Sequence, residues 1–454
     1  MSANPVLLDD ASMRNFIVDG YVVVKADFPD DVHQSIFRQT EAVFENEGNP
    51  GNNILPRVPQ LQRVLEHPRV RGALASILGP DYYPHPCRHC HFNTPGSPGQ
   101  QMHRDSFTRR RHRTRWAMVF YYPQDVPEEK GPTAVAPGSH YHNTYCQDEA
   151  APEVPLGGEA GTVVIVHYDL WHRGTPNRTD QKRFMHKFLI TRMREPESPS
   201  WQSAASAWPQ TDDPRLAMWQ NMWDWHSGRP PKGRSAAAAD SVAPLIRGLQ
   251  GESEAQCLQA AYALGALGES AVPALVEVLQ DESEALRRNA AYALSALGSA
   301  AVPALIEATA DARAWTRDSA VDALADIGRP ARAAVPALIA ALGDEAARVR
   351  GRAAEALGIL GQAAAAAVPA LIAALRDAEQ EVRRHAVLAL ARMGPAAARA
   401  LPALIEVQRD VDRYVRSKAL KALEEIATPP ARRALLDALL LARWCPTTTR
   451  ESTF

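Results

Sequence analysis

The stretch "QMHRDSF" at residues 101–107 places an imidazole, a guanidinium and a carboxylate side by side, in His103, Arg104 and Asp105. The same three letters open the catalytic loop of protein kinases. That loop carries an asparagine further along, at a position that Arg110 holds here, and it is accompanied by a glycine-rich loop and an Asp-Phe-Gly motif. Because this chain has none of these features, the sequence excludes a kinase.

A metal site is the second interpretation of this stretch. Alternate side chains of a strand point to the same face, so His103 and Asp105 would project together, with Arg104 on the opposite face. A facial iron site also needs a second histidine. The segment "GTVVIVHYDLWHRG" offers two, namely His167 within the apolar run and His172 after it, in an expected turn.

Arg183 distinguishes these two histidines. It follows His172 in "HRGTPNRTDQKR" and stands at the head of the next expected strand. A guanidinium fixed there can bind a carboxylate through two parallel hydrogen bonds. His167 lacks such a sequel, so His172 is the favoured partner of His103 and Asp105.

A second cluster of metal-binding residue types is "PCRHCH", residues 86–91. A closed zinc site needs four ligands, and no second cysteine pair lies at a suitable spacing. With the period of a strand, one face would carry Cys87, His89 and His91, and the other Arg88, Cys90 and Phe92. We therefore favour a strand over a zinc site.

The elements around these residues are short and rich in β-branched and aromatic side chains. The expected strands are "YVVVKA", "RWAMVFYY", "TAVAP", "GTVVIVHY" and "RFMHKFLITR", separated by Gly- and Pro-containing turns. Helical patterns cover about 30–47 and 60–78. Many short strands of this kind predict a sandwich or barrel.

A tryptophan-rich segment follows at 196–239. It is rich in Pro, Ser and Gly at both ends, as a linker is, yet it holds five of the nine tryptophans of the chain. Aromatic surface of that size is nearly always buried. We expect the segment to pack between two domains; a wall facing the substrate is the alternative.

From residue 240 onward the sequence repeats. Motifs such as "AVPALIEAT" and "AVPALIAAL" place prolines at 244, 273, 303, 336, 369 and 402, and patterns such as "VRGRAAEALGILG" run between them. Proline suits the first turn of one helix, and glycine ends the other. Each unit is thus a helix pair that must stack on its neighbours to bury its apolar face.

The repeats at about 240–427 resemble HEAT repeats of the phycobilisome-lyase type. Deoxyhypusine hydroxylase, a HEAT-repeat enzyme, binds iron through His-Glu dipeptides, and this sequence contains no such dipeptide. An arginine recurs at one repeat position: Arg287, Arg317, Arg350, Arg383 and Arg416. We interpret this ladder as structural, capping helix ends or pairing with aspartates of neighbouring repeats, rather than as a ligand site.

The region of about 14–195 resembles the phytanoyl-CoA dioxygenase-like family of Fe(II)- and 2-oxoglutarate-dependent oxygenases. The resemblance rests on "QMHRD", "DVPEEKGPTAVAPGSH" and "LWHRGTPNRTDQKR". It implies a double-stranded β-helix with His103, Asp105 and His172 as iron ligands. Arg183 would bind the distal carboxylate of 2-oxoglutarate, with dioxygen as the second co-substrate. Halogenases of the family lack the carboxylate that Asp105 supplies, so halogenation is not expected.

The family often has a serine two residues after its distal histidine, where this chain has Gly174. Thr175 is the expected substitute. Contacts to the other carboxylate of 2-oxoglutarate are expected from the segments 88–93 and 116–122. His140 in "APGSH" is expected to stabilise a turn.

The substrate is the least determined part of the function. Arg109, Arg111 and Arg115 in "FTRRRHRTRW" could border the mouth of the site and bind an anionic small molecule, although a charge run usually faces water. The expected reaction is hydroxylation of an unactivated C–H bond. The alternatives are desaturation, epimerisation or ring formation on the same fold, and an interaction scaffold with a degenerate oxygenase domain.

The composition is that of a soluble protein of several domains, with a net charge of -2 over 454 residues. It predicts neither nucleic-acid nor membrane binding. Five scattered cysteines and the lack of a signal-peptide pattern favour the cytoplasm. The expected domains are an oxygenase over 1–195, the tryptophan-rich segment over 196–239 and an all-α HEAT solenoid over 240–454, which could bind a protein partner.

Overall fold

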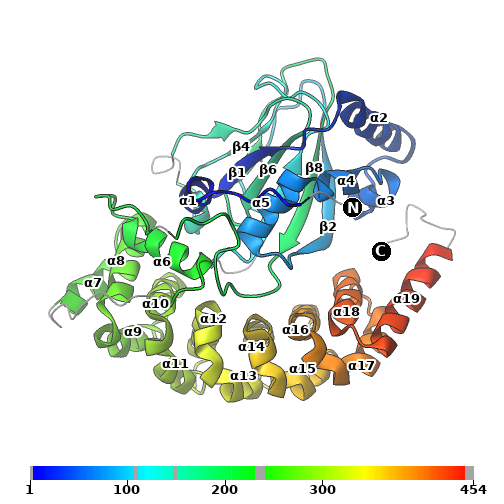
Figure 1. The fold of residues 1–454 in the computed structure, drawn as a ribbon. Coiled ribbons are helices and arrows are strands. Elements are labelled where there is room, and N and C mark those ends of the chain that lie inside the picture. Colours follow the sequence, from blue (N-terminus) through cyan, green and yellow to red (C-terminus); the bar gives the residue numbers. More distant parts are fainter. Residues whose placement is uncertain (1–3, 107–110, 147–150, 206, 231–240, 445–454) are drawn as a thin grey trace. The chain divides into compact units, whose positions relative to one another are not determined.

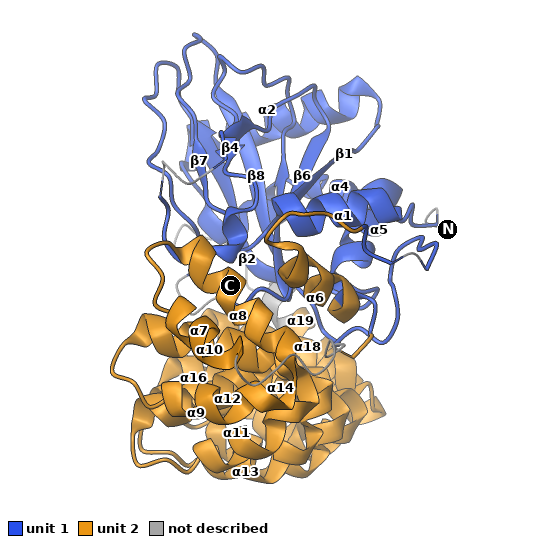
Figure 2. Ribbon diagram, turned by 90° about the vertical axis from the view of Figure 1, so that its left-hand side faces the viewer, with its two compact units in different colours: residues 1–209, 226–228, 453–454 blue, residues 210–225, 229–452 orange. Residues whose placement is uncertain are grey.

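The computed structural model describes residues 4–106, 111–146, 151–205, 207–230 and 241–444 (Figure 1). These fall into two compact units (Figure 2). The first holds residues 1–209 and 226–228, and the second holds 210–225 and 229–452. Each is described by itself below.

Two antiparallel sheets form the core of the first unit. The larger has the strand order β1-β6-β3-β8-β2, and the smaller has the order β5-β4-β7. The strands are β1 (Tyr21–Lys25), β2 (Tyr83–Asn93), β3 (Trp116–Tyr121), β4 (Thr133–Val135), β5 (Val154–Pro155), β6 (Thr162–His167), β7 (His172–Gly174) and β8 (Arg183–Thr191). The five predicted strand runs are all confirmed, and the antiparallel pair of sheets is the predicted jelly-roll.

The space between the two sheets is filled by apolar side chains from both. Met118, Phe120 and Val164 of the large sheet share one buried cluster with Val135 of the small sheet. Met185 and Leu189 of β8 belong to the same cluster, so the odd-numbered positions of this strand, from Arg183 on, face the interior. This alternation decides which polar side chains of β8 can reach a site between the sheets.

Helices cover the outer face of the large sheet (Figure 1). Phe37 and Phe44 of α2 (Asp30–Glu47) pack against Phe184 of β8, which also stacks on Phe92 of β2. The remaining helices of this unit are α1 (Asp10–Asp19), α3 (Ile54–Arg57), α4 (Leu61–Glu66) and α5 (Pro68–Leu78). The helical patterns expected at about 30–47 and 60–78 are thereby confirmed.

The cluster "PCRHCH" lies within β2, as predicted. Its register pairs Cys90 with His186 and His91 with Met185 of β8. His91 therefore shares the interior face, whereas Cys90 and Phe92 face the helices. The described residues of this cluster do not form a group that could hold a zinc ion. The group of potential metal ligands found among the described residues consists of His103, Asp105 and His172 instead.

All five tryptophans of the segment 196–239 are buried. Trp201 and Trp208 belong to the first unit, where the Trp201 indole donates to Asp10 (2.6 Å). The other three, Trp219, Trp223 and Trp225, lie on α6 (Leu216–His226) and belong to the second unit. Packing of this segment between the domains, and the domain boundaries at 195 and 240, stay predictions.

The second unit is a stack of helix pairs. One helix of each pair is short: α7 (Val242–Gly248), α9 (Val272–Val278), α11 (Val302–Ala308), α13 (Val335–Ala341), α15 (Val368–Ala374) and α17 (Leu401–Glu406). The other is longer: α8 (Glu254–Leu267), α10 (Glu284–Leu297), α12 (Ala314–Ile327), α14 (Ala347–Leu360), α16 (Gln380–Met393) and α18 (Arg413–Ile426). Helix α19 (Pro429–Trp444) follows.

The turn residues of the repeats behave as the sequence predicts. Proline occupies the first turn of α9, α11, α13, α15 and α17. After α14 and α16 the chain turns at Gly361 and Gly394, each with φ of 57°, which side chains other than glycine rarely adopt. These glycines let consecutive helices reverse direction within a short connection.

The arginine ladder is structural, as predicted. Arg350 binds the carboxylate of Asp377 in the next repeat through two hydrogen bonds of 2.7 and 2.9 Å, and it also donates to the carbonyls of Asp344 and Glu345. Arg317 and Arg383 repeat this arrangement with Asp344 and Asp410. Arg287 and Arg416 likewise donate to carbonyls in the preceding turn.

Three continuous helical stretches of the array are long and apolar enough, by length and composition, to cross a membrane: Glu284–Ala308, Ala347–Ala374 and Gln380–Arg409. Each spans at least two helices joined by a short 3₁₀ turn, and at least half of each apolar window is buried. Stacking between repeats accounts for this apolar surface. The expected lack of membrane contact stays a prediction.

Candidate metal centre

His103 and His172 lie opposite each other in a single antiparallel bridge. The backbone N–H of each donates to the carbonyl of the other, at 2.9 and 2.8 Å. The expectation of a strand through residues 103–105 is wrong, because only His103 makes this bridge. The expectation of a turn at His172 is also wrong, because His172 opens β7. The pairing that replaces them brings the two imidazoles to a centroid distance of 4.6 Å.

Both imidazoles are oriented by the same local contact. Nδ1 of His103 lies 2.9 Å from the carbonyl of Gln101, and Nδ1 of His172 lies 2.9 Å from the carbonyl of Leu170. With Nδ1 donating to these carbonyls, Nε2 of each ring keeps its lone pair for a metal ion. This is the usual way in which a protein fixes the tautomer of a histidine ligand.

Asp105 completes the group. Its Oδ2 lies 3.6 Å from Nε2 of His172, and one donor atom each from His103, Asp105 and His172 lie within 4.8 Å of one another. Within the described residues, His103, Asp105 and His172 form the group of three potential ligands that could hold a metal ion. Two imidazoles and a carboxylate on one side of a site suit non-haem iron.

The charge states of these ligands favour a cation. Burial alone would raise the pKa of Asp105, but Lys187 and His172 outweigh it and hold the pKa below its usual value. Burial lowers the pKa of His172 to about 4, against the opposing effect of Asp105. At neutral pH the carboxylate is therefore charged and the imidazole neutral, which are the forms that bind metal ions.

Arg104 points away from this group, as predicted. Its guanidinium donates to the carbonyl of Asn143 (2.7 Å) and lies 5.0 Å from the ring centroid of Trp171. The rival histidine His167 lies apart from the group, with its ring 4.9 Å from that of His140. His140 is buried in a short 3₁₀ turn, which agrees with the expected structural role.

Arg183 begins β8, as predicted, and faces the interior. Its side chain is 3% exposed, and its Nε donates to the carbonyl of Gly131 (2.9 Å). Its Nη1 is buried and has no hydrogen-bond partner. A buried donor of this kind is costly unless a ligand satisfies it.

His91 lies on the same interior face as Arg183. Its β8 neighbour is Met185, the residue between Arg183 and Lys187 on that face, and its Nε2 is buried without a partner. Burial, Lys187 and Arg183 lower the pKa of His91 to about 3, so its imidazole is neutral. The unpartnered nitrogens of Arg183 and His91 fit an anionic ligand that reaches from Arg183 toward the metal group. His91 falls in the segment 88–93, from which such contacts are expected.

Thr175 is bound by the protein itself. Its hydroxyl donates to the carbonyl of Pro132 (2.7 Å). A Cβ on Gly174 would lie 3.1 Å from Oε1 of Gln100 and 3.6 Å from Nη2 of Arg183. Gln100 therefore occupies the space beside the Arg183 guanidinium in which a side chain on Gly174 would lie, a role that the sequence did not indicate.

The three arginines expected at the mouth differ in their surroundings. Arg115 is 5% exposed and binds both carboxylate oxygens of Glu195, at 2.8 and 3.0 Å, so its guanidinium is already occupied. Arg111 is partly exposed. Arg109 lies outside the described residues. Of the two arginines that the structure describes, only Arg111 is exposed enough to contact a substrate.

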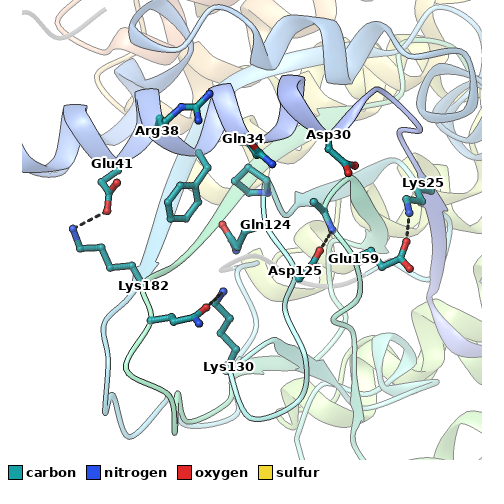
Figure 3. Close-up of a pocket in the computed structure, with 14 residues that line it drawn as sticks. Lys25, Asp30, Gln34, Arg38, Glu41, Gln124, Asp125, Lys130, Glu159 and Lys182 are labelled. Carbon is teal, nitrogen blue, oxygen red and sulfur yellow. Dashed lines mark hydrogen bonds and ion pairs between the residues drawn. The ribbon is translucent and has the colours of Figure 1, made fainter.

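A cavity of about 940 Å³ lies beside α2, and none of the predicted site residues lines it (Figure 3). Two ion pairs lie among its charged side chains, Lys182 with Glu41 and Lys25 with Glu159. Lys130 donates to the amide of Gln181 at its wall (2.7 Å). This cavity is separate from the metal group, and its size alone does not make it the active site.

The fold and the site together define the class of the first unit: a jelly-roll oxygenase domain with a His-Asp-His metal group. Residues 18–185 match the sequence model of the phytanoyl-CoA dioxygenase family, and residues 242–325, 302–368 and 368–444 match that of HEAT repeats. The chain therefore joins a domain of the phytanoyl-CoA dioxygenase family to an array of HEAT repeats. Iron and 2-oxoglutarate, the predicted cofactors, agree with this family and with the donor set.

Several solved structures are similar to parts of the chain. The non-haem alpha-ketoglutarate-dependent carbocyclase SnoK from nogalamycin biosynthesis is 18% identical over 42% of this chain and 88% of its own, with a TM-score of 0.35. HygX from Streptomyces hygroscopicus, solved with nickel and 2-oxoglutarate, is 15% identical over 41% and 88%, with a TM-score of 0.34.

A designed armadillo repeat protein in complex with a (KR)4 peptide is 23% identical over 41% of this chain and 99% of its own, with a TM-score of 0.32. No curated protein shows significant similarity to the chain. At these TM-scores the structural likenesses carry no weight for the reaction or the substrate.

Proposed function

We propose that the first unit is an Fe(II)- and 2-oxoglutarate-dependent dioxygenase that hydroxylates an unactivated C–H bond of a small molecule. The observation that carries the proposal is that His103, Asp105 and His172 each place one donor atom within 4.8 Å of the other two. The unpartnered guanidinium nitrogen of Arg183 supports it, since a buried cation on the same interior face suits a dicarboxylic acid.

The residues divide the work as follows. His103, Asp105 and His172 would hold the iron ion, which supplies the activation of dioxygen when bound. Arg183 would bind the distal carboxylate of 2-oxoglutarate, and His91 would donate or accept a hydrogen bond along its length. Phe120 belongs to the buried apolar cluster and its ring centroid lies 5.7 Å from that of His172, so this cluster would keep water from that side of the site.

The substrate is proposed to enter past Arg111. Its partly exposed position after the metal-binding stretch suits an anionic group on the substrate. Thr175 stays a candidate for the 2-oxoglutarate site because it follows Gly174. Its hydroxyl, however, already donates to the carbonyl of Pro132, so it is the weaker candidate.

The test is turnover of 2-oxoglutarate by the full chain with Fe(II) and ascorbate, followed as succinate. The Asp105→Ala variant, which removes one metal ligand, should lose at least about 100-fold in rate. Lack of both succinate and anaerobic Fe(II) binding by the unaltered chain would instead support an interaction scaffold with a degenerate oxygenase domain.

The type of reaction is tested by the product. We expect a mass gain of one oxygen in a metabolite pool treated with the unaltered chain, and none with Asp105→Ala. A loss of two hydrogens would identify desaturation or ring formation. A product of unchanged mass would identify epimerisation.

We also propose that the HEAT array binds a protein partner. Stacked helix pairs present extended surfaces of the kind that other repeat proteins use for binding. Cross-linking in cell extract with mass spectrometry should recover cross-links from residues 242–444 to one partner. Cross-links confined to the chain itself would contradict this role.

A further inference from the structure

Lys187 is a cation in direct contact with one of the proposed iron ligands. It lies on the interior face of β8, two positions after Met185 of the buried cluster. Its Nζ donates to Oδ2 of Asp105 at 2.8 Å, and its side chain is only 14% exposed. An ammonium group held this close to a ligand carboxylate is expected to influence any second cation that binds there.

The same carboxylate oxygen faces both Lys187 and the second histidine. Oδ2 of Asp105 lies 3.6 Å from Nε2 of His172 and 2.8 Å from Nζ of Lys187. A metal ion that binds Oδ2 must therefore compete with the ammonium group for this oxygen, and one that binds Oδ1 still shares the carboxylate with the ammonium group. Either way, two cations compete for one carboxylate.

The surrounding charges strengthen this competition. The ionic groups that act most strongly on His91 are the cations Lys187 and Arg183 and the carboxylate of Asp105, with a smaller effect from His89. Two cations thus face one carboxylate before any metal ion is bound. A divalent metal ion increases the excess of positive charge, whereas a dianion such as 2-oxoglutarate offsets it.

We propose that Lys187 makes metal binding depend on 2-oxoglutarate. Without the dianion its ammonium group pairs with Asp105 and weakens the affinity for the metal ion; when the dianion binds, the ammonium group pairs with it instead and releases Asp105 to the metal ion. The inference rests on the proposed function. Because the effect is a coupling between two ligands, each must raise the affinity of the other by the same factor. Lys187 is thus a positioning residue that favours loading of the site with both ligands together.

The test uses the full chain and Mn(II), titrated calorimetrically under anaerobic conditions with and without 2-oxoglutarate. In the unaltered chain we expect 2-oxoglutarate to tighten Mn(II) binding about tenfold or more. Lys187→Met should bind Mn(II) alone about tenfold more tightly, bind 2-oxoglutarate more weakly and show a smaller coupling, because only the attraction between Mn(II) and the dianion themselves remains. Equal coupling in both proteins, or weaker Mn(II) binding by Lys187→Met, would overturn the proposal.

Two further variants separate charge from folding. Lys187→Arg keeps the charge and should keep the coupling. Lys182→Met removes a charge from the neighbouring turn, where Lys182 pairs with Glu41 and Glu45, and should leave both affinities unchanged. If Lys182→Met changed the coupling as much as Lys187→Met, the effect would be one of overall charge. Failure of the unaltered chain to bind Mn(II) at all would overturn the proposed function itself.

Discussion

At the scale of single residues, the side chain of Gln100 lies next to the proposed 2-oxoglutarate site. The side-chain Oε1 accepts from the backbone N–H of Gly174 (3.1 Å), and the backbone N–H of Gln100 donates to the carbonyl of Gly174 (2.8 Å). These two contacts hold the amide beside the guanidinium of Arg183. Its Nε2 is then a donor that could serve a carboxylate bound by Arg183.

Gln100→Leu should raise the 2-oxoglutarate concentration needed for half-maximal turnover about fivefold to tenfold, because one hydrogen bond to a charged group is lost. Thr175→Val should change it less, since the Thr175 hydroxyl donates to Pro132. Steady-state kinetics of succinate formation measures both. A larger effect of Thr175→Val than of Gln100→Leu would restore Thr175 as the substitute for the family's serine.

His186 provides a second test at this scale, away from the metal group. Burial lowers its pKa to about 3, and its ring packs on Tyr121 with Nε2 3.1 Å from the hydroxyl of Thr40. Because the pKa is lower in the folded state than in the unfolded chain, the folded state favours the neutral ring. Its contribution to stability is complete above pH of about 6.5 and is lost as the pH falls from there toward about 3.

The free energy of unfolding of the first unit should fall by about 2 kcal/mol between pH 7.5 and pH 5 on account of His186 alone. His186→Phe, which fills the same space without a titrating group, should be less sensitive to acid by that amount. Urea unfolding at both pH values measures the difference. Equal losses in both proteins would show that His186 stays neutral in the unfolded chain or is hydrated in the fold.

At the scale of elements, the repeats are joined by the arginine ladder as well as by apolar stacking. Arg350 reaches from α14 to Asp377, whose Oδ1 also accepts from the backbone N–H of Glu379 before α16. Arg350 therefore connects the turn before its own helix α14 to the turn before the next long helix, α16. The side chains of this pair are 18% and 11% exposed, so water screens them only partly.

Arg350→Ala should lower the free energy of unfolding of the array by about 2 kcal/mol, because it leaves Asp377 and two carbonyls without this donor. Arg376→Ala is the matched control. Arg376 pairs with Glu406, but both side chains are exposed, so the loss should be small. Circular dichroism during urea unfolding compares the two variants. Equal effects would mean that the ladder is no stronger than an ordinary surface ion pair.

At the scale of the whole molecule, the chain combines two units that are stabilised in different ways. The first is held by a core between two sheets, with contacts between strands far apart in the sequence. The second is held by contacts between neighbouring repeats. A single free energy of unfolding does not describe such a chain.

Calorimetry should therefore show two unfolding transitions. Mn(II) with 2-oxoglutarate, each at about 100 times its dissociation constant, should stabilise the transition of the first unit by a few kcal/mol and leave the other in place. Arg350→Ala should shift only the transition of the array. A single transition that moves in both experiments would show that the two units unfold together.

The sequence predicted much of this architecture because its signals are local. A strand run, a proline at the start of a helix such as Pro336, or a turn glycine such as Gly361 determines the backbone conformation of only a few neighbouring residues. The errors arose where long-range pairing decides. His103 was expected in a strand, yet a single bridge to His172 holds it.

The sequence by itself determined the composition of the metal group, because only certain residue types can bind iron and 2-oxoglutarate together. It also determined the repeat architecture, through proline and glycine at fixed spacing. The tertiary structure decided which groups surround that site. Lys187, Gln100 and His91 reach it by pairing of distant strands and loops, and Arg115 is taken out of it by Glu195. Such contacts depend on register and on burial, which no local pattern encodes.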